Sequence, residues 1–275
     1  MIFLNNFKKT NFTFFVFIIF SILSLSAQND TMFVMKNGNV VAKYNINNEI
    51  DSIVFVRSTT PINDFFVDER DSNVYHTVTI GTQIWMSENL RYLPYVIGNN
   101  WTSSTIPMYH VYGYYGTSVI DAKATTNYNT YGVLYNWPAA MTSYSISNSN
   151  STEIKGVCPT GWHLPSDLEW SELGTYLGGD SIAGGKLKEA GTVHWASPNT
   201  GATNETNFNG LPGGSLMPIT YAFEGLRGNG YFWSSTEANA TGAWYRALIS
   251  YSSILTKYSY PVSKNMAMSI RCIKN

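Results

Sequence analysis

The chain has 275 residues, of which 44% are hydrophobic and 15% aromatic, enough for a sizeable core in one large domain or two small ones. Only 13% are charged and the net charge is −1, so there is no basic field to attract nucleic acid and no polybasic run to hold a membrane surface. We therefore exclude nucleic acid as a partner. A surface covered by Asn, Ser, Thr, Gly and Tyr favours an extracellular binding protein over a cytosolic enzyme.

Residues 1–27 have the pattern of a secretory signal peptide. Two lysines precede an apolar run at residues 12–25, and the small residues Ser26 and Ala27 follow it. The run is too short, and too interrupted by Ser and Thr, to span a bilayer comfortably. We therefore favour export with cleavage after Ala27 over a membrane anchor, and we expect no transmembrane span after cleavage.

Residues 28–58 predict a small N-terminal β-segment. Asn37-Gly38 lies between two apolar, β-branched runs, and both residues tolerate the positive φ of a type I′ hairpin turn. A third strand is predicted at residues 53–56. Such a short segment cannot hold a stable core alone, so we expect it to pair with the main domain, a neighbour or a partner chain. Residues 59–67 are interpreted as a linker.

Residues 68–275 have the pattern of one α+β domain. Apolar and polar residues alternate on both sides of Gly81, which predicts a β-hairpin. Residues 95–130 are rich in Tyr, Asn, Thr and Gly and predict a long irregular segment. Ser166 and Glu169 form a capping box, which predicts the start of a helix that Gly178-Gly179 ends.

The remaining elements of this domain are short. A second helix is predicted at residues 183–190, and most of the chain from residue 192 onward has the composition of turns and short strands. With two helices in the middle and strands at both ends, the pattern favours antiparallel pairing in an α+β fold. The predicted late strands are residues 231–236, 243–250, 254–260 and 269–274.

Six motifs in this domain resemble one family. In chain order they are "TIGTQIWMSENLRYLP", "YGVLYNWPAAM", "GVCPTGWHLPSDLEWSELGTYLGG", "AGGKLKEAGTVHWASPNTGATNETNFNGLPGG", "GYFWSST" and "SIRCIK". They resemble the Fibrobacter succinogenes major paralogous domain family, which is similar to the C-type lectin-like fold and to formylglycine-generating-enzyme-type domains. The resemblance implies a lectin-like domain with two short helices, antiparallel strands and long loops. It also implies a secreted or surface protein of Bacteroidetes or a related phylum, with no defined activity.

The resemblance also implies a disulfide between Cys158 and Cys272. In C-type lectin-like domains a disulfide joins the segment before the first helix to the last strand, and the two cysteines occupy these places. An exported chain with an even number of cysteines suits this use. Without a CxxC pair or clustered histidines, zinc is a weak alternative. A catalytic thiol with His163 as its base is another weak alternative, because it leaves Cys272 unexplained.

Calcium-dependent sugar binding is not supported by the residues. Lectins that use calcium supply a carboxylate-Pro-carboxamide triplet and a Trp-Asn-Asp triplet as oxygen ligands. Here Ser197-Pro198-Asn199 lacks the acid, and two serines follow Trp233. We expect no metal site and no cofactor, with a structural calcium held by backbone carbonyls as an open alternative. We interpret Asn199, Asn204, Asn207 and Asn209 as turn formers.

No catalytic constellation is visible. The four histidines are scattered singly, and Asp167, Glu169 and Glu172 are explained by helix capping and solvation. There is no Ser-His-Asp order, phosphate loop or HExxH motif. Oxidase chemistry of the formylglycine-generating kind would need the cysteine pair that the disulfide uses. We therefore predict that the protein is not an enzyme. The alternatives are an enzyme acting on polysaccharide or cell envelope through an unrecognised site, and a purely structural surface protein.

A C-terminal stretch carries the candidate binding residues. "WSSTEANATGAWYRALISYSSILTKYSYP" concentrates Trp, Tyr, Ser and Asn, a composition typical of adaptable binding surfaces. For Trp233 and Trp244, burial in the core is the favoured alternative. We predict a non-catalytic binding protein that is extracellular or at the bacterial cell surface, with the periplasm as the alternative, and whose ligand is a protein or a glycan. The candidate ligand-binding residues are Trp244, Tyr245, Arg246, Tyr251, Tyr258 and Tyr260.

Overall fold

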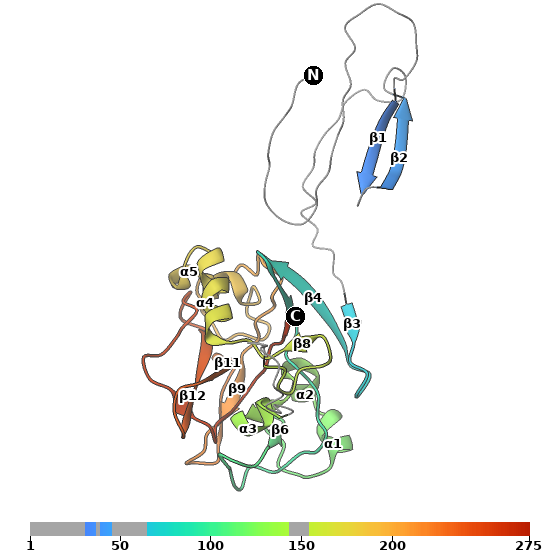
Figure 1. The fold of residues 1–275 in the computed structure, drawn as a ribbon. Helices are drawn as coiled ribbons and strands as arrows, with labels where there is room; N and C mark the ends of the chain where they lie inside the picture. Colours follow the sequence, from blue (N-terminus) through green and yellow to red (C-terminus); the bar gives the residue numbers. More distant parts are fainter. Residues whose placement is uncertain (1–30, 37–38, 46–64, 143–153) are drawn as a thin grey trace, which may run out of the picture. The chain divides into compact units, whose positions relative to one another are not determined.

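The structure is a computed structural model that describes residues 31–36, 39–45, 65–142 and 154–275 (Figure 1). The chain divides into two compact units, Met1–Thr60 and Pro61–Asn275. These boundaries separate the N-terminal hairpin from the strands and helices of the larger unit, and each unit has its own internal pairing.

The first unit contains an antiparallel pair of strands. β1 (Thr31–Lys36) pairs with β2 (Asn39–Asn45), as the hairpin pattern predicts, with an irregularity between Val34 and Met35. The predicted turn at residues 37–38, the predicted third strand and the predicted signal peptide lie outside the described residues.

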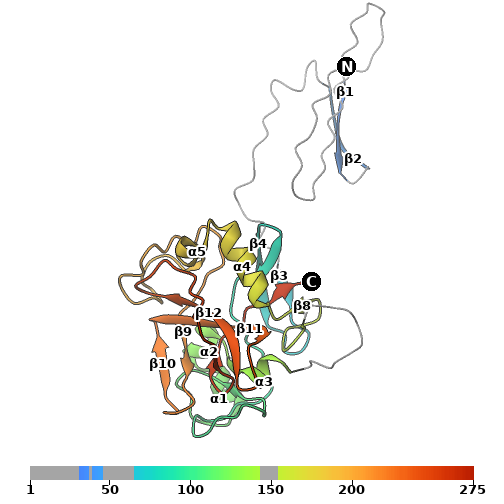
Figure 2. The same cartoon turned by 60° about the vertical axis from the view of Figure 1, so that its left-hand side comes forward.

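The larger sheet of the second unit combines strands from the middle and the end of the chain. Its order is β13-β12-β11-β9-β14-β7-β6, and β10 also pairs with β9. Figure 2 shows β9, β10, β11 and β12 side by side. The strands are β6 (Tyr109–His110), β7 (Leu134–Asn136), β9 (Gly213–Leu216), β10 (Phe223–Leu226), β11 (Asn229–Glu237), β12 (Gly242–Ile249), β13 (Val262–Ser263) and β14 (Ala267–Met268).

The second sheet has the order β3-β4-β5-β15-β8. The predicted hairpin around Gly81 is confirmed, because β4 and β5 pair antiparallel and Gly81 takes a φ of 65° between them. The last strand, β15, lies between β5 and β8, which brings the C-terminus back to the first strands of this unit. The strands are β3 (Phe65–Val67, at the end of the predicted linker), β4 (Val74–Ile80), β5 (Gln83–Met86), β8 (Trp162–His163) and β15 (Ile273–Lys274).

The two predicted helices are present. α4 (Asp167–Tyr176) begins at the N-cap Ser166, and its capping box with Glu169 is complete, as predicted. α5 (Asp180–Leu187) begins and ends earlier than the predicted range. It ends early because Lys188 takes extended backbone and bridges Gly210 instead of continuing the helix.

The expectation of only two helices is wrong, because the described residues contain three further short ones. Two of them lie in or overlap the segment predicted to be irregular. Their four to six residues are too short to show a 3.6-residue period, although each begins at a side-chain cap. They are α1 (Val119–Lys123, cap Ser118), α2 (Thr126–Tyr131, cap Thr125) and α3 (Trp137–Ala140, cap Asn136).

Two of the predicted late strands differ from the structure. Residues 254–260 form no strand, because the backbone at the start of this segment bonds to α5: Gly185 N donates to Ser253 O (2.9 Å), and Leu255 N donates to Asp180 O (2.8 Å). One bridge between Thr256 and Ala247 remains. Within residues 269–274, only the last two before Asn275 form a strand.

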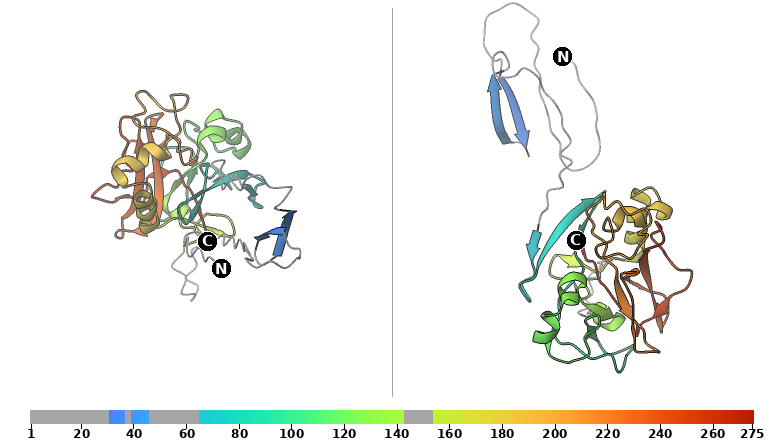
Figure 3. Two further views of the ribbon diagram at one scale, coloured as in Figure 1. Left: turned by 90° about the horizontal axis from the view of Figure 1, so that it is seen from above. Right: turned by 180° about the vertical axis from the view of Figure 1, so that it is seen from behind.

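The strands β11 and β12 separate two hydrophobic cores. Trp233 and Tyr245 belong to one core, while Phe232 and Leu248 on the opposite face belong to the other. α4 and α5 contribute to this second core, and Figure 3 shows both helices next to these strands. Trp233 is fully buried, as its core interpretation predicts.

The second unit is therefore a mixed α+β domain with short helices and many strands. In the part of the chain that the structure describes, no helix has the length and apolar character needed to cross a membrane.

Candidate functional site

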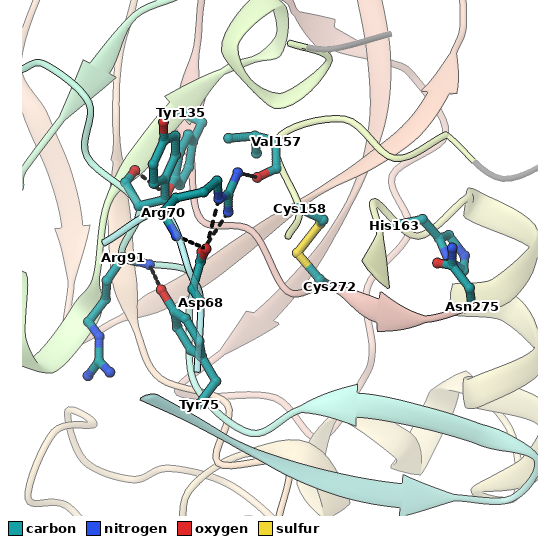
Figure 4. The surroundings of a disulfide bond; sticks show 11 residues. Asp68, Arg70, Tyr75, Arg91, Tyr135, Val157, Cys158, His163, Cys272 and Asn275 are labelled. Carbon is teal, nitrogen blue, oxygen red and sulfur yellow. Dashed lines mark hydrogen bonds and ion pairs between the residues drawn. A yellow bond between two sulfur atoms is a disulfide. The ribbon is translucent and has the colours of Figure 1, made fainter. Parts of the chain in front are cut away.

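The predicted disulfide is present and fixes the end of the chain. Cys158, before α4, bonds to Cys272, next to β15, with an S–S distance of 1.99 Å and both residues fully buried (Figure 4). Beside it, Arg70 donates to the buried carboxylate of Asp68 and to Val157 O (2.8 Å). The bond and this ion pair tie the segment before α4 to the second sheet, so both cysteines have a structural use.

A groove of about 300 Å³ lies where β9 to β13 come together. Four tyrosines line it, and we call it the tyrosine groove. Tyr231 comes from β11 and Tyr245 from β12, while Tyr258 and Tyr260 come from the segment between β12 and β13. Its size is near the lower end of the range for small-ligand pockets, so it suits one residue or one sugar unit.

Hydrogen bonds to β12 hold the segment that carries Tyr258 and Tyr260 at both ends. On one side, the backbone N–H groups of Ala247 and Thr256 each donate to the other's carbonyl, at 3.0 and 2.9 Å. On the other side, β13 pairs with the start of β12. The two tyrosines are therefore carried over the sheet by a segment with two fixed ends.

The four tyrosine rings form a continuous row. The ring centroids of Tyr231 and Tyr245 lie 6.1 Å apart, those of Tyr245 and Tyr258 lie 5.3 Å apart, and those of Tyr258 and Tyr260 lie 6.0 Å apart. Among the described residues none is a hydrogen-bond partner of these four phenol groups. The row thus offers apolar ring area together with hydroxyls that are available to a ligand.

Burial raises the pKa of three of these phenols. It raises the pKa of Tyr231 to about 12, with smaller contributions from Tyr258, Tyr251 and Glu224 nearby. Burial also raises the pKa of Tyr245 and of Tyr258 above the ordinary value of 10. At neutral pH each of these hydroxyls can therefore donate one hydrogen bond as well as accept others.

The six candidate binding residues do not all lie at the tyrosine groove. Tyr245, Tyr258 and Tyr260 line the tyrosine groove, and Tyr251 is 71% exposed and close enough to contribute to the pKa values of Tyr231 and Tyr258. Trp244 and Arg246 alternate with Tyr245 along β12, so they point to the other face of the sheet.

On that other face Arg246 is fully buried. Its guanidinium donates to Asp167 Oδ1 (2.9 Å) and to Ser171 Oγ (2.7 Å) on α4. Trp244 is half-buried, and the ammonium of Lys257 lies 5.2 Å from its ring centroid. Arg246 therefore joins the sheet to α4, whereas Trp244 contacts Lys257, whose ammonium pairs with Asp167 of α4.

Some residues of the groove are not among the candidates from the sequence. Tyr231 could have been found, because it lies two residues before the buried Trp233 and therefore on the same face of β11. Glu224 on β10, Met217 just after β9 and Met266 just before β14 also line the groove. No local pattern marks them, because strand order alone brings them together.

The histidines and acids outside the groove form separate local pairs. His163 Nε2 lies 2.7 Å from the Glu169 carboxylate. Burial alone would raise the pKa of Glu169, but the hydrogen bonds from His163 and Ser166 have the larger combined effect, so the pKa is lowered. Burial lowers the pKa of His110 to about 4. Across residues 65–142 and 154–275, no group of three or more His, Cys, Asp or Glu is placed to hold a metal ion.

The asparagines predicted to form turns do so. All four adopt the left-handed region, with φ between 45° and 56°: Asn199, Asn204, Asn207 and Asn209. Asn199 Nδ2 donates to the carbonyls of Glu189 and Gly191, so its side chain closes a loop.

Comparison with known proteins places this architecture in a family. The sequence matches the family described as Fibrobacter succinogenes major domain (Fib_succ_major) over residues 78–274. Among curated proteins and among solved structures, none matches the chain. The matched region contains both cysteines and all the residues of the tyrosine groove. The chain therefore belongs to the Fibrobacter succinogenes major domain family.

Proposed function

We propose that this protein is an exported, non-catalytic binding protein, extracellular or held at the bacterial cell surface, whose ligand is a protein or a carbohydrate. The observation that carries the proposal is the tyrosine groove, in which three candidate residues from the sequence meet Tyr231 in one hollow. Rigid rings with hydroxyl tips provide apolar area and hydrogen bonds at low entropic cost, which suits both ligand classes.

The chemistry of the groove supports binding over catalysis. Glu224 is its acidic residue, and the described lining contains no histidine, lysine or cysteine that could act with it. Glycoside hydrolysis needs two carboxyl groups facing one bond. Glu169, whose pKa is lowered, serves the capping box of α4 and does not line the groove.

We further propose that the domain is C-type lectin-like and works in an oxidising compartment. The disulfide joins the segment before α4, the first of the two helices predicted from the sequence, to the residue that precedes the last strand, which is similar to the pairing implied by the resemblance to that fold. A disulfide of this kind persists outside the cytosol, which agrees with the predicted signal peptide at residues 1–27.

An array of glycans and cell-surface proteins tests the proposal. We expect the mature chain to retain a ligand, and Tyr258→Ala and Tyr260→Ala to weaken its binding about tenfold or more. Tyr176→Ala on α4 is the matched control, because Tyr176 is about as exposed (65%) as Tyr260 (63%) but does not line the groove. Unchanged binding by both groove variants, or chemical turnover of the retained ligand, would contradict the proposal.

A further inference from the structure

The tyrosine groove carries charge of one sign only. Among the described residues that line it, Glu224 is the charged one, and its side chain is exposed. The lysines of the neighbouring segment are engaged elsewhere: Lys257 Nζ pairs with Asp167 (2.5 Å), and Lys264 pairs with Glu237. A ligand group that enters the groove therefore meets a carboxylate and no cation in the described lining, which favours a positive charge on the ligand and disfavours a negative one.

The aromatic row strengthens this preference. Tyrosine faces attract ammonium and guanidinium groups through the negative charge of the ring face. The phenol oxygens, which have no hydrogen-bond partner among the described residues, can accept N–H donors from the same group. The phenol of Tyr231, whose pKa burial raises to about 12, is neutral at physiological pH, and its oxygen can accept such a donor.

The rest of the lining is apolar and fits an aliphatic stem. Met217, Val262 and Met266 contribute side chains without strong hydrogen-bonding groups. Lysine and arginine carry several methylenes below a charged tip, and such stems pack on apolar surface while the tip finds a polar partner. An amino sugar has hydroxyls around its whole ring, and some of them would face these apolar side chains without a partner.

We propose that the tyrosine groove binds a basic side chain, lysine or arginine, of a partner protein, with its stem on the tyrosine and methionine side chains and its cation beside Glu224. This inference rests on the proposed function and names the ligand class of the same site. Charge complementarity and the apolar walls together carry it.

Nuclear magnetic resonance titration of the mature chain tests the inference. The probes are Nα-acetyl-lysine amide, its Nε-acetylated neutral counterpart, Nα-acetyl-arginine amide and glucosamine, and the readout is the amide signals of Gly225 and Asn229 in the groove lining. We expect lysine and arginine to shift these signals, and Nε-acetylation to weaken binding about fivefold or more.

Glu224→Gln should weaken lysine binding about fivefold and reduce the preference over the acetylated probe to the part that the tyrosine rings supply. Glu205→Gln is the matched control, an exposed acid that pairs with Lys186 at 3.0 Å and does not line the groove. The inference is overturned if no probe shifts the two signals, if glucosamine or acetylated lysine binds at least as tightly as lysine, or if Glu224→Gln binds lysine unchanged.

The same experiment separates the two proposals. If Tyr260→Ala weakens an array ligand while Glu224→Gln and the charge of the probe have no effect, the groove is a binding site for a different class of ligand. If Tyr258→Ala and Tyr260→Ala leave every array ligand unaffected, the proposed function itself fails.

Discussion

The rings of Tyr245 and Tyr258 stack with their centroids 5.3 Å apart and an interplanar angle of 20°. Tyr245 belongs to β12 and Tyr258 to the segment after it, so the stack attaches one wall of the groove to the sheet. The two partners differ in burial, since Tyr245 is 7% exposed and belongs to a core, whereas Tyr258 is half-buried.

This difference predicts that truncation of the two rings has unequal effects on stability. We expect Tyr245→Ala to lower the free energy of unfolding by about 3 kcal/mol, because it leaves a cavity in the core. Tyr258→Ala should lower it by about 1 kcal/mol, mainly through the lost ring contact. Urea denaturation measures both values, and Tyr258→Phe, which keeps the stack, is the control. Equal losses for the two alanine variants would contradict the deeper burial of Tyr245.

The raised pKa of Tyr231 predicts a loss of stability in alkaline solution. Its pKa is about 12 in the folded chain against an ordinary value of 10, so the folded state holds this proton more tightly. The contribution is complete below about pH 10 and is lost as the pH rises toward 12. Urea denaturation at increasing pH should show a steeper decline for the natural chain than for Tyr231→Phe. Parallel declines would show that Tyr231 is not the group responsible.

Local signals in the sequence are sufficient to predict several elements. The capping box of Ser166 and Glu169 predicts α4, Gly81 predicts the β4–β5 turn, and the asparagines at turn positions need only their own backbone preference. These features depend on neighbours within a few residues. The disulfide follows from the family resemblance, and the structure pairs Cys158 with Cys272.

The groove could be predicted only in part, because it depends on strand order. Period-two alternation along β12 is enough to put Tyr245 on one face and Trp244 and Arg246 on the other. By contrast, Glu224 reaches Tyr231 only because β9 pairs with both β10 and β11. The three strands follow one another between residues 213 and 237, but no pattern within any one of them encodes the order that places β9 between β10 and β11.

The lowered pKa of Glu169 predicts acid sensitivity. Hydrogen bonds from His163 and Ser166 outweigh the effect of burial and leave this pKa below its ordinary value of 4.5. The unfolded state therefore binds more protons in acid, and the stabilising contribution is present above about pH 4.5 and lost as the pH falls through the lowered pKa. Urea denaturation between about pH 3 and pH 7 should give a flatter profile for Glu169→Gln. Glu172→Gln on the same helix is the control and should keep the natural profile; an unchanged profile for Glu169→Gln would contradict this origin.

The disulfide predicts a large effect on stability and a small one on the groove. The bond closes a loop with a sequence separation of 114 residues. On the chain-entropy account, Cys158→Ala together with Cys272→Ala should lower the free energy of unfolding by about 4 kcal/mol. Urea denaturation measures this loss, and ligand binding by the remaining folded protein should stay within about twofold of the natural chain. If the folded variant instead lost ligand binding, the disulfide would be needed for the structure of the groove, contrary to this prediction.

Arg246 offers the sharpest test of which face of β12 binds the ligand. Its guanidinium is fully buried and holds Asp167 and Ser171 of α4, on the face opposite Tyr245. Removing the buried arginine leaves Asp167 without one of its two cations, so we expect Arg246→Ala to lower the free energy of unfolding by about 3 kcal/mol.

This expected loss is at the low end of the range for such pairs because Asp167 keeps its second cation, Lys257, at 2.5 Å. Arg246→Lys should retain part of the stability, since an ammonium can reach one carboxylate oxygen but cannot reproduce the guanidinium fork. Ligand affinity, measured at a temperature where each variant is folded, should be the same for the natural chain and both variants. If Arg246→Ala instead loses the ligand while its unfolding midpoint in urea is unchanged, the arginine belongs to the binding site, and the tyrosine groove is not the place where the ligand is held.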